Sequence, residues 1–181
     1  MIAKGDLVVA PPQCLDREFR NSVVMLTDHS RDGTMGLVLN RSTEVTLNEL
    51  LAPLDLVLPW QHQLYWGGPV APDMIFMLHS SEWSIKGNTH KIDRNWSYTT
   101  HWKMFHHLAD YDEPQHWRVF AGCAAWAPQQ LLGEINSSNP RLSWLVINKP
   151  DTGGLLDQDG DALWSWSTSR ATEQAVSALM A

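Results

Sequence analysis

The chain has 181 residues, 44% hydrophobic and 18% charged, as expected for one globular domain that needs neither disulfides nor a structural metal to fold. Its net charge of −7, from 13 Lys and Arg against 20 Asp and Glu, argues against DNA or RNA as the main partner, because phosphate binding depends on cationic side chains. No stretch approaches the roughly 18 consecutive apolar residues of a membrane span, and the start of the chain lacks the apolar segment of a signal peptide. We therefore expect a soluble, cytoplasmic protein without membrane contact, with a single domain over residues 1–181.

The N-terminal part of the chain predicts a strand and a hairpin. Residues 7–10 are apolar and stop at two prolines, which is typical of a short buried strand. Residues 22–27 and 36–40 are two apolar, β-branched runs, and the polar, turn-forming residues 28–33 lie between them. This arrangement predicts an antiparallel hairpin whose loop is longer than the tight two-residue type.

More strands and a first helix follow. Thr46 can cap a helix and Glu49 can reach back to it, so this capping-box pattern predicts a short helix through Leu51. The remaining predicted strands span residues 65–70, 74–79, 117–123 and 142–147. Because the strands pair as hairpins and helices interrupt them irregularly, the pattern favours an α+β fold over an alternating parallel sheet.

Three more helices are expected. Thr99 or Thr100 can cap the first of them. Its apolar face is predicted to hold Trp102, Phe105 and Ala109. Pro128 marks the start of the next helix, which should end near Asn139. The last is expected from about residue 161, with an apolar stripe formed by Ala171, Ala175, Val176 and Leu179.

The motifs of common catalytic sites are absent, namely GxSxG, the P-loop, GxGxxG, HExxH and zinc-spaced cysteine pairs. His101, His106 and His107 do not have the spacing of three or four residues that two metal ligands on one helix need. Residues 157–161 resemble the start of an EF-hand loop but lack its glycine at position six and its glutamate at position twelve, so an acidic turn is favoured. We therefore expect no catalytic residue set, no metal site and no cofactor.

The remaining candidates for chemistry have structural alternatives. Cys14 and Cys123 lie far apart in the sequence and are expected to be free thiols, with Cys123 a small buried residue rather than a nucleophile. Asp28 and His29 are the best acid/base pair of the chain, yet neighbouring residues on a strand face opposite ways. Ordering of the loop by His29 is therefore favoured over catalysis.

Two features of the composition leave alternatives open. Residues 84–107 contain four Lys and Arg against one Asp, whereas the segment from residue 150 onward is acidic. A solvated surface is the favoured interpretation of this contrast, and recognition of a small anion is the alternative. The ten Trp residues are expected mainly in the core, and an aromatic surface for bases, sugars or a partner protein is the alternative.

Short motifs over most of the chain occur in a distinctive order. They are residues 5–11 (GDLVVAP), 15–19 (LDREF), 22–26 (SVVML) with His29, 33–41 (GTMGLVLNR), 67–70 (GGPV), 78–80 (LHS), and Trp126 before Gln130 and Leu131. In this order they resemble the AlgH/YqgE family of bacterial proteins. The chain departs from the family pattern at Arg17 and Ser42, where proline is usual, at Ala125 and Gln129 within a glycine-rich stretch, and at Leu132, where glutamate is usual.

The resemblance implies an α+β fold whose mixed, mainly antiparallel sheet curls into a pseudo-barrel with flanking helices, and it implies a cytosolic location. It supplies no established activity. Some relatives carry a transcriptional-regulator label, but the acidic charge of this chain gives direct DNA reading no physical support. The resemblance is compatible with indirect regulation.

Several polar residues lie at the ends of apolar strands and are our candidate ligand-binding residues. They are His29, Asn40, Arg41, His79 and Ser80. If two or more of these strand ends meet, they form a cleft with an arginine that can hold an anion and a histidine that can titrate. In the alternative interpretation, these side chains only satisfy one another and the turns.

We therefore expect a binding or regulatory module that acts through an unknown protein partner or a small anionic ligand. A hydrolase or transferase is the first alternative, with His29 or His79 as base and Arg41 holding an anion. A transcriptional regulator that acts indirectly is the second alternative. Direct nucleic-acid binding is not expected.

Overall fold

The computed structural model describes residues 1–150 and 154–180. A ten-stranded sheet has the order β10-β1-β2-β3-β9-β6-β8-β7, while β4 pairs with β5 and β5 with β9. The strands are β1 (Leu7–Val9), β2 (Val23–Ser30), β3 (Gly33–Val38), β4 (Ser42–Thr46), β5 (Gln63–Trp66), β6 (Val70–Ser80), β7 (Thr89–Lys91), β8 (Trp96–Thr99), β9 (Trp117–Trp126) and β10 (Leu145–Ile147). The helices are α1 (Leu47–Leu51), η1 (Ala52–Leu54), α2 (Lys103–Ala109), α3 (Gln130–Ile135) and α4 (Gly160–Leu179).

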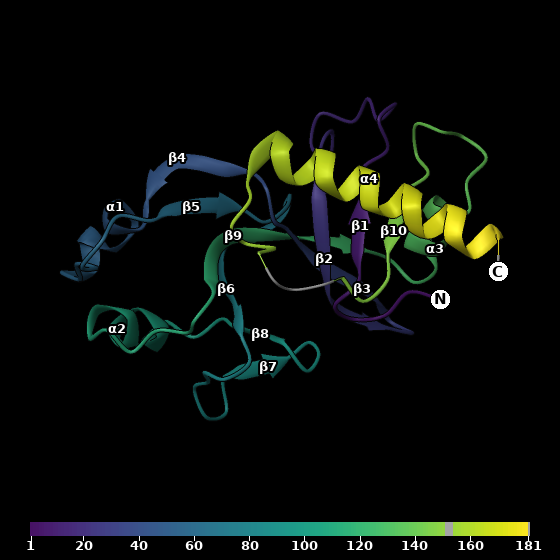
Figure 1. Cartoon of the computed structure of the whole chain (residues 1–181). Coiled ribbons are helices and arrows are strands. Elements are labelled where there is room, and N and C mark those ends of the chain that lie inside the picture. Colours follow the sequence, from purple (N-terminus) through teal and green to yellow (C-terminus); the bar gives the residue numbers. More distant parts are fainter. Residues whose placement is uncertain (151–153, 181) are drawn as a thin grey trace.

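The sheet is mainly antiparallel and curls into a half-barrel. The β5–β9 pair is parallel, which makes the sheet mixed. Helix α4 lies across β1, β2 and β10, while α1 and α2 lie at the other end of the molecule (Figure 1). The predicted α+β fold with a curled, mainly antiparallel sheet and flanking helices is confirmed.

The first hairpin forms as predicted, but its loop is shorter. Strand β2 continues to Ser30 and pairs there with Gly33, so only Arg31 and Asp32 form the turn. The prediction of a longer loop was wrong. Residues 28–30 are polar because this end of β2 is exposed or half-buried, not because the strand has ended.

The helix starts show where local signals decide the structure. The capping box is confirmed, because Thr46 accepts a hydrogen bond from the backbone N–H of Glu49 and Glu49 accepts one from that of Thr46. The predicted threonine cap of α2 was wrong, since Thr99 lies in β8 opposite Met77 and Trp102 takes the N-cap position without a side-chain bond. Pairing with β6 thus outweighs the capping tendency.

The apolar faces of the helices also differ in part from the prediction. Trp102 is 55% exposed, and the buried face of α2 consists of Met104, Phe105 and Leu108. Helix α3 ends at Ile135, before the predicted end near Asn139. In α4 the buried residues are Leu163, Ser167 and Ala171, whereas Val176 and Leu179 of the predicted stripe are exposed.

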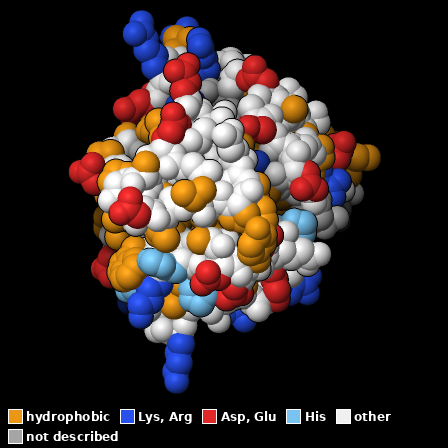
Figure 2. Space-filling model, turned by 90° about the vertical axis from the view of Figure 1, so that its left-hand side faces the viewer, with side chains coloured by type: hydrophobic (Ala, Val, Ile, Leu, Met, Phe, Trp, Pro, Cys, Tyr) orange, Lys and Arg blue, Asp and Glu red, His pale blue; other side chains and the backbone are white. Residues whose placement is uncertain are grey.

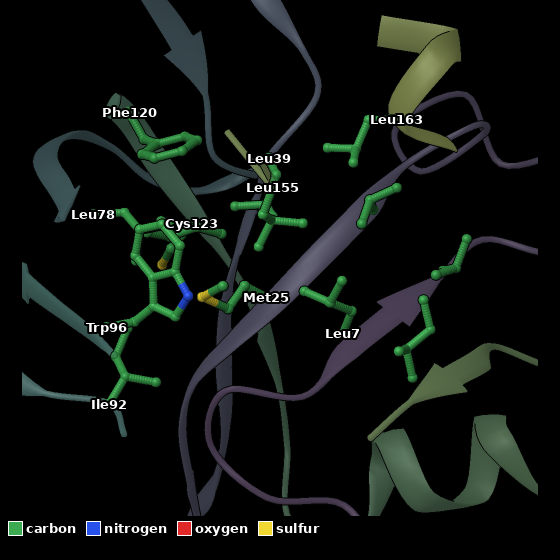
Figure 3. Close-up of a cluster of buried hydrophobic side chains, with 14 of the residues drawn as sticks. Leu7, Met25, Leu39, Leu78, Ile92, Trp96, Phe120, Cys123, Leu155 and Leu163 are labelled. Atoms are coloured by element: carbon green, nitrogen blue, oxygen red, sulfur yellow. The ribbon is translucent and has the colours of Figure 1, made fainter. Parts of the chain in front are cut away.

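Three hydrophobic clusters form the core. The first fills the space between the curled sheet and α4, and Figure 3 shows it with Met25 drawn between Trp96 and Leu7. The second joins β1, β2 and the end of β9 to α3, and the third lies under α1 and α2. Burial of one large apolar side chain, such as Phe120 with 0% exposure, stabilises the fold by about 1.5–3 kcal/mol.

The chain between β5 and β6 crosses β9 at very close range. Gly68 has φ +149°, and a Cβ there would lie 2.1 Å from the carbonyl carbon of Cys123. A Cβ on Gly67 would lie 2.2 Å from the carbonyl oxygen of Gly122. Positions 67 and 68 therefore require glycine, because a residue with a Cβ would collide with the β9 backbone.

Candidate functional site

Two of the predicted site residues, Asn40 and Arg41, bind the backbone of neighbouring segments. The Asn40 amide oxygen accepts from Val23 N, and its nitrogen donates to the carbonyl oxygens of Asn21 and Gly160, each at 2.8 or 2.9 Å. Arg41 donates to the carbonyl oxygens of Glu18 and Arg20. These bonds use all three hydrogen-bonding groups of Asn40 and direct the Arg41 guanidinium into the protein.

Arg41 also packs on an aromatic ring. Its guanidinium carbon lies 4.7 Å from the ring centroid of Trp66. Burial, together with the charge of Arg20, lowers the pKa of Arg41. Here the arginine connects β5 to residues 18–22.

The predicted histidines occupy different surroundings. The Nδ1 atom of His29 lies 2.7 Å from Oγ1 of Thr34, across the β2–β3 hairpin. His79 is fully buried, with Nδ1 3.0 Å from the carbonyl oxygen of Ser80 and Nε2 3.0 Å from Oγ1 of Thr99. Since the carbonyl can only accept, Nδ1 of His79 carries the proton and Nε2 accepts from Thr99. Burial lowers the pKa of His79.

The five candidate residues do not share one cleft. Thr34, the partner of His29, pairs with Trp126 at the end of β9, whereas His79 pairs with Trp117 at its start. These positions are the two ends of a ten-residue strand, about 30 Å apart along the strand at 3.3 Å per residue step. Of the five, Ser80 lines a surface pocket whose cationic side chains have no carboxylate partner within the described residues.

That hollow lies around Arg94, in the turn between β7 and β8. A pocket of about 570 Å³ lies on one side of the turn and a second of about 650 Å³ on the other, and both are lined by Arg94 and Asn95. The first is also lined by Ser80, Ser81, Glu82, Lys91, Trp96, Gln115 and His116. The second is also lined by Met1, Ala3, Lys4, Gly5, Asp6, Asp93, Asn148, Lys149 and Pro150. We call the two together the Arg94 pockets.

The acidic groups of the Arg94 pockets are engaged with neutral donors. Asp93 accepts from the backbone N–H of Asn95 and Trp96 at 2.7 and 2.8 Å, which fixes the turn that presents Arg94. Asp6 is buried and accepts from Ala3 N, Asn148 Nδ2 and Lys149 N. Oε1 of Glu82 accepts from the Ser80 hydroxyl and Gln115 N.

The cations of the same pockets are exposed. Within residues 1–150 and 154–180, Arg94 and Lys91 have no carboxylate within 4.0 Å, and Lys4 reaches Asp28 only at 3.7 Å. The basic segment noticed at residues 84–107 thus supplies two unpaired cations to one hollow. Sequence reasoning did not single out Asp6 as a site residue, although it lies next to an apolar strand and belongs to the family motif at residues 5–11.

Arg118, also missed, is a buried cation inside β9. Its guanidinium donates to the carbonyl oxygens of Leu39 and Leu156 at 2.6 and 2.8 Å and lies 4.1 Å from the Tyr65 ring centroid. The Tyr65 hydroxyl donates to Asp159, which also caps α4. Burial raises the pKa of Tyr65 to about 12 despite the opposing effect of Arg118. These contacts fix the start of α4 on the sheet, and residues 157–161 therefore cap a helix.

His107 of α2 and His101, which precedes this helix, contact other side chains. Nδ1 of His107 lies 2.6 Å from Asp112, and Trp102 stacks on His101. Figure 2, which looks at the side of α1 and α2, shows histidine, acidic and hydrophobic side chains interspersed on this face. No group of three or more His, Cys, Asp or Glu that could hold a metal occurs among the described residues. Cys14 and Cys123 are free and buried.

A family model described as AlgH-like (DUF179) matches residues 7–175. The chain belongs to the AlgH-like family. A UPF0301 protein of Methylocella silvestris is 36% identical over 154 residues, which cover 79% of this chain and 73% of the relative. A UPF0301 protein of Shewanella denitrificans is 30% identical over 169 residues, which cover 91% of this chain and 89% of the relative.

Solved structures agree with this AlgH-like membership. The solution structure of the AlgH protein from Pseudomonas aeruginosa matches with a TM-score of 0.75 and 28% identity, over 92% of this chain and 87% of that one. A protein from Corynebacterium diphtheriae shares the fold at a TM-score of 0.66 and 23% identity, over 85% of this chain and 78% of that one. The predicted family is confirmed, and the names of these relatives state no activity.

The AlgH-like chain has no helix, within its described parts, that is long and apolar enough to span a bilayer. Residues of the family motifs line pockets in two places. Gly5 and Asp6 belong to the Arg94 pockets. Pro11, Phe19, Pro69, Trp126 and Gln130 line a third pocket, on the other side of β1 and β2, beside α3.

Proposed function

We propose that this protein is a binding module for a small anionic ligand, which it holds in the Arg94 pockets. One observation carries the proposal. Arg94 lines both pockets, with Lys91 beside it, and neither side chain has a carboxylate partner within the described residues. The volumes of about 570 and 650 Å³ lie in the range of small-molecule sites, which is roughly 300–1,000 Å³.

The lining favours a phosphate or carboxylate group. A guanidinium binds either group through two parallel hydrogen bonds, and an ammonium adds a point charge. Lys91 ends β7, Arg94 lies three residues later in the β7–β8 turn, and both line the first pocket, where they offer two cationic groups to one anion. The side chains of Ser81 and Asn95 supply neutral hydrogen-bonding groups around it.

A regulatory role through this ligand, or through a partner protein that responds to it, is part of the proposal. Direct DNA binding is not, because the chain has a net charge of −7. We place this activity in the cytoplasm, where thiols such as Cys14 and Cys123 stay reduced.

Binding is favoured over hydrolysis or group transfer. His79 lies next to Ser80 in sequence, but both of its ring nitrogens are hydrogen-bonded inside the protein. The Ser80 hydroxyl donates to Glu82 rather than to a histidine, and His116 contacts it only through its backbone N–H and carbonyl oxygen. The base beside this serine is therefore a carboxylate, and no imidazole of the described residues contacts the hydroxyl to activate it as a nucleophile.

Calorimetric titration with inorganic phosphate and pyrophosphate, at constant ionic strength, tests the proposal. We expect saturable binding that Arg94→Gln weakens at least tenfold, because a charge-assisted hydrogen bond contributes about 1.5–3 kcal/mol. Arg17→Gln is the matched control, since it removes an exposed arginine outside the Arg94 pockets. Absence of binding, or equal loss in the two variants, would refute a site at Arg94.

A further inference from the structure

A separate pocket of about 190 Å³ lies on the α3 side of the sheet. It is lined by four segments: the β1–β2 connection, the β5–β6 crossing, the end of β9 with α3, and the residues before β10. Its lining residues of interest are Phe19, Trp126, Glu134, Arg141 and Trp144. We call it the aromatic pocket.

Three aromatic rings pack against one another at this pocket. The ring centroid of Phe19 lies 6.3 Å from that of Trp126, in a stacked orientation, and 5.6 Å from that of Trp144, edge to face. The two indoles meet at 5.8 Å and 84°. The faces of aromatic rings carry negative potential, and rings in differing orientations around a hollow favour a cation inside it.

A carboxylate lies among these rings without a countercharge. Oε2 of Glu134 accepts from the indole N–H of Trp126 at 3.1 Å and of Trp144 at 2.8 Å, and Oε1 accepts from Gln130 at 2.9 Å. A carboxylate has about four acceptor sites, so three donors leave one free. No Lys, Arg or His within residues 1–150 and 154–180 lies within 4.0 Å of Glu134.

The bonds to Glu134 also explain why the pocket keeps its shape. Both tryptophans are buried, and among the described residues their indole N–H groups have no other partner than this carboxylate. The negative charge is therefore fixed in place before any ligand arrives, which reduces the ordering cost of binding. At the edge of the pocket, Asp16 and Arg141 are exposed.

We propose that the aromatic pocket binds a small organic cation, namely an alkylammonium group with an apolar surface. The rings contact the alkyl groups and attract the charge, and Glu134 supplies the opposite charge. The size agrees, because a cavity of about 150 Å³ holds a molecule as large as benzene in another protein. This site is independent of the Arg94 pockets and takes a ligand of opposite charge.

The test compares choline with 3,3-dimethylbutan-1-ol, its neutral isostere, by NMR titration of the tryptophan indole N–H signals. We expect saturable binding of choline that shifts two indole signals, and at least tenfold weaker binding of the neutral alcohol. Equal binding of the two would show that the pocket recognises shape alone and would overturn the proposal. No shift with either compound would overturn it as well.

Glu134→Gln should weaken choline binding at least tenfold while the neutral alcohol binds as before. Glu113→Gln is the matched control, because Glu113 also accepts from an indole, that of Trp117 at 3.1 Å, but lies outside the pocket. Equal choline affinity in wild type and Glu134→Gln contradicts the proposal.

Arg141→Gln tests the site without disturbing the bonds to the tryptophans. Removal of a like charge from the edge of the pocket should tighten choline binding several-fold, and unchanged or weaker binding counts against a cation site. Phosphate binding at Arg94 should be the same in all three variants, so the two proposed sites can fail separately.

Discussion

The aromatic pocket and the Arg94 pockets are built in opposite ways. In the aromatic pocket, Glu134 accepts from two buried tryptophans, so its polar groups belong to the scaffold. In the Arg94 pockets, the carboxylates of Asp6 and Asp93 bind backbone N–H groups, while Lys91 and Arg94 remain exposed and unpaired within the described residues. Binding and stability should therefore be coupled in the first and separable in the second.

The largest difference is expected when each pocket loses one side chain. Trp144→Ala should lower the free energy of unfolding by about 3–5 kcal/mol, because Trp144 is buried and its removal leaves a cavity and takes away one of the two indole donors to Oε2 of Glu134. Arg94→Ala should change it by less than about 0.5 kcal/mol, as for an exposed residue without a partner. Urea unfolding measures both changes. Similar values for the two variants would contradict the expectation that binding and stability are coupled only in the aromatic pocket.

His79 lies beside Ser80 of the Arg94 pockets, yet it belongs to the scaffold because it is fully buried. Burial lowers its pKa, and the nearby Glu82 opposes this effect only in part. The unfolded chain therefore binds more protons than the folded one, and the stabilising effect is complete above the unfolded pKa of about 6.5 and lost as the pH falls toward the folded pKa. Unfolding of wild type and His79→Gln should converge in stability below pH 6.5. The contribution of His62, whose pKa burial also lowers, is present in both proteins and cancels.

Salt should separate the two proposed ligands. Raising the ionic strength from about 0.01 to 0.15 M shortens the Debye length from about 30 to 8 Å and screens exposed charges most. We expect phosphate affinity to fall several-fold and choline affinity to fall less, because Glu134 is half-buried among the rings. Titrations at the two salt concentrations give the change in affinity for each ligand. An equal loss of affinity for phosphate and choline would indicate that both bind at solvent-exposed sites.

The smallest effect is expected at Gln129, just before α3. Its φ of +64° is in the left-handed region, where glycine is not strained, and the family pattern is rich in glycine here. Gln129→Gly should raise the free energy of unfolding by up to about 1 kcal/mol, whereas Gln129→Ala should not. Thermal unfolding measures this, and a less stable glycine variant would show that the Gln129 side chain stabilises the turn.

Much of the fold was predictable because its signals are local. Thr46 and Glu49 form their capping box within one turn of helix, and the two runs around residue 30 pair as neighbours in sequence. The hairpin loop and the start of α2 were not predictable in this way. Polar residues at the exposed end of β2 resemble a loop, and Thr99 is held in β8 by its pairing with β6.

The candidate sites also differ in whether neighbouring or distant residues form them. Lys91 and Arg94 were visible as part of a basic segment, because the turn that presents them is only a few residues long. Asn40 and Arg41 had the right residue types for a ligand site, but their partners, at residues 18–23 and 160, come from elsewhere in the chain. A polar side chain at a strand end looks the same in sequence whether it binds a ligand or a distant carbonyl group.

Most of the strands, the capped helix, the family and the surplus of cations in residues 84–107 were predictable from the sequence, whereas β4, β7 and β8 were missed. The predicted features depend on residues close together in the chain, or on motifs in a fixed order. The burial of Arg118 against Tyr65, and the position of Glu134 among three aromatic rings without a cation beside it within the described chain, follow from the three-dimensional packing alone. Such arrangements depend on burial and on contacts between distant segments, which become defined only when the sheet has curled and its two faces are covered.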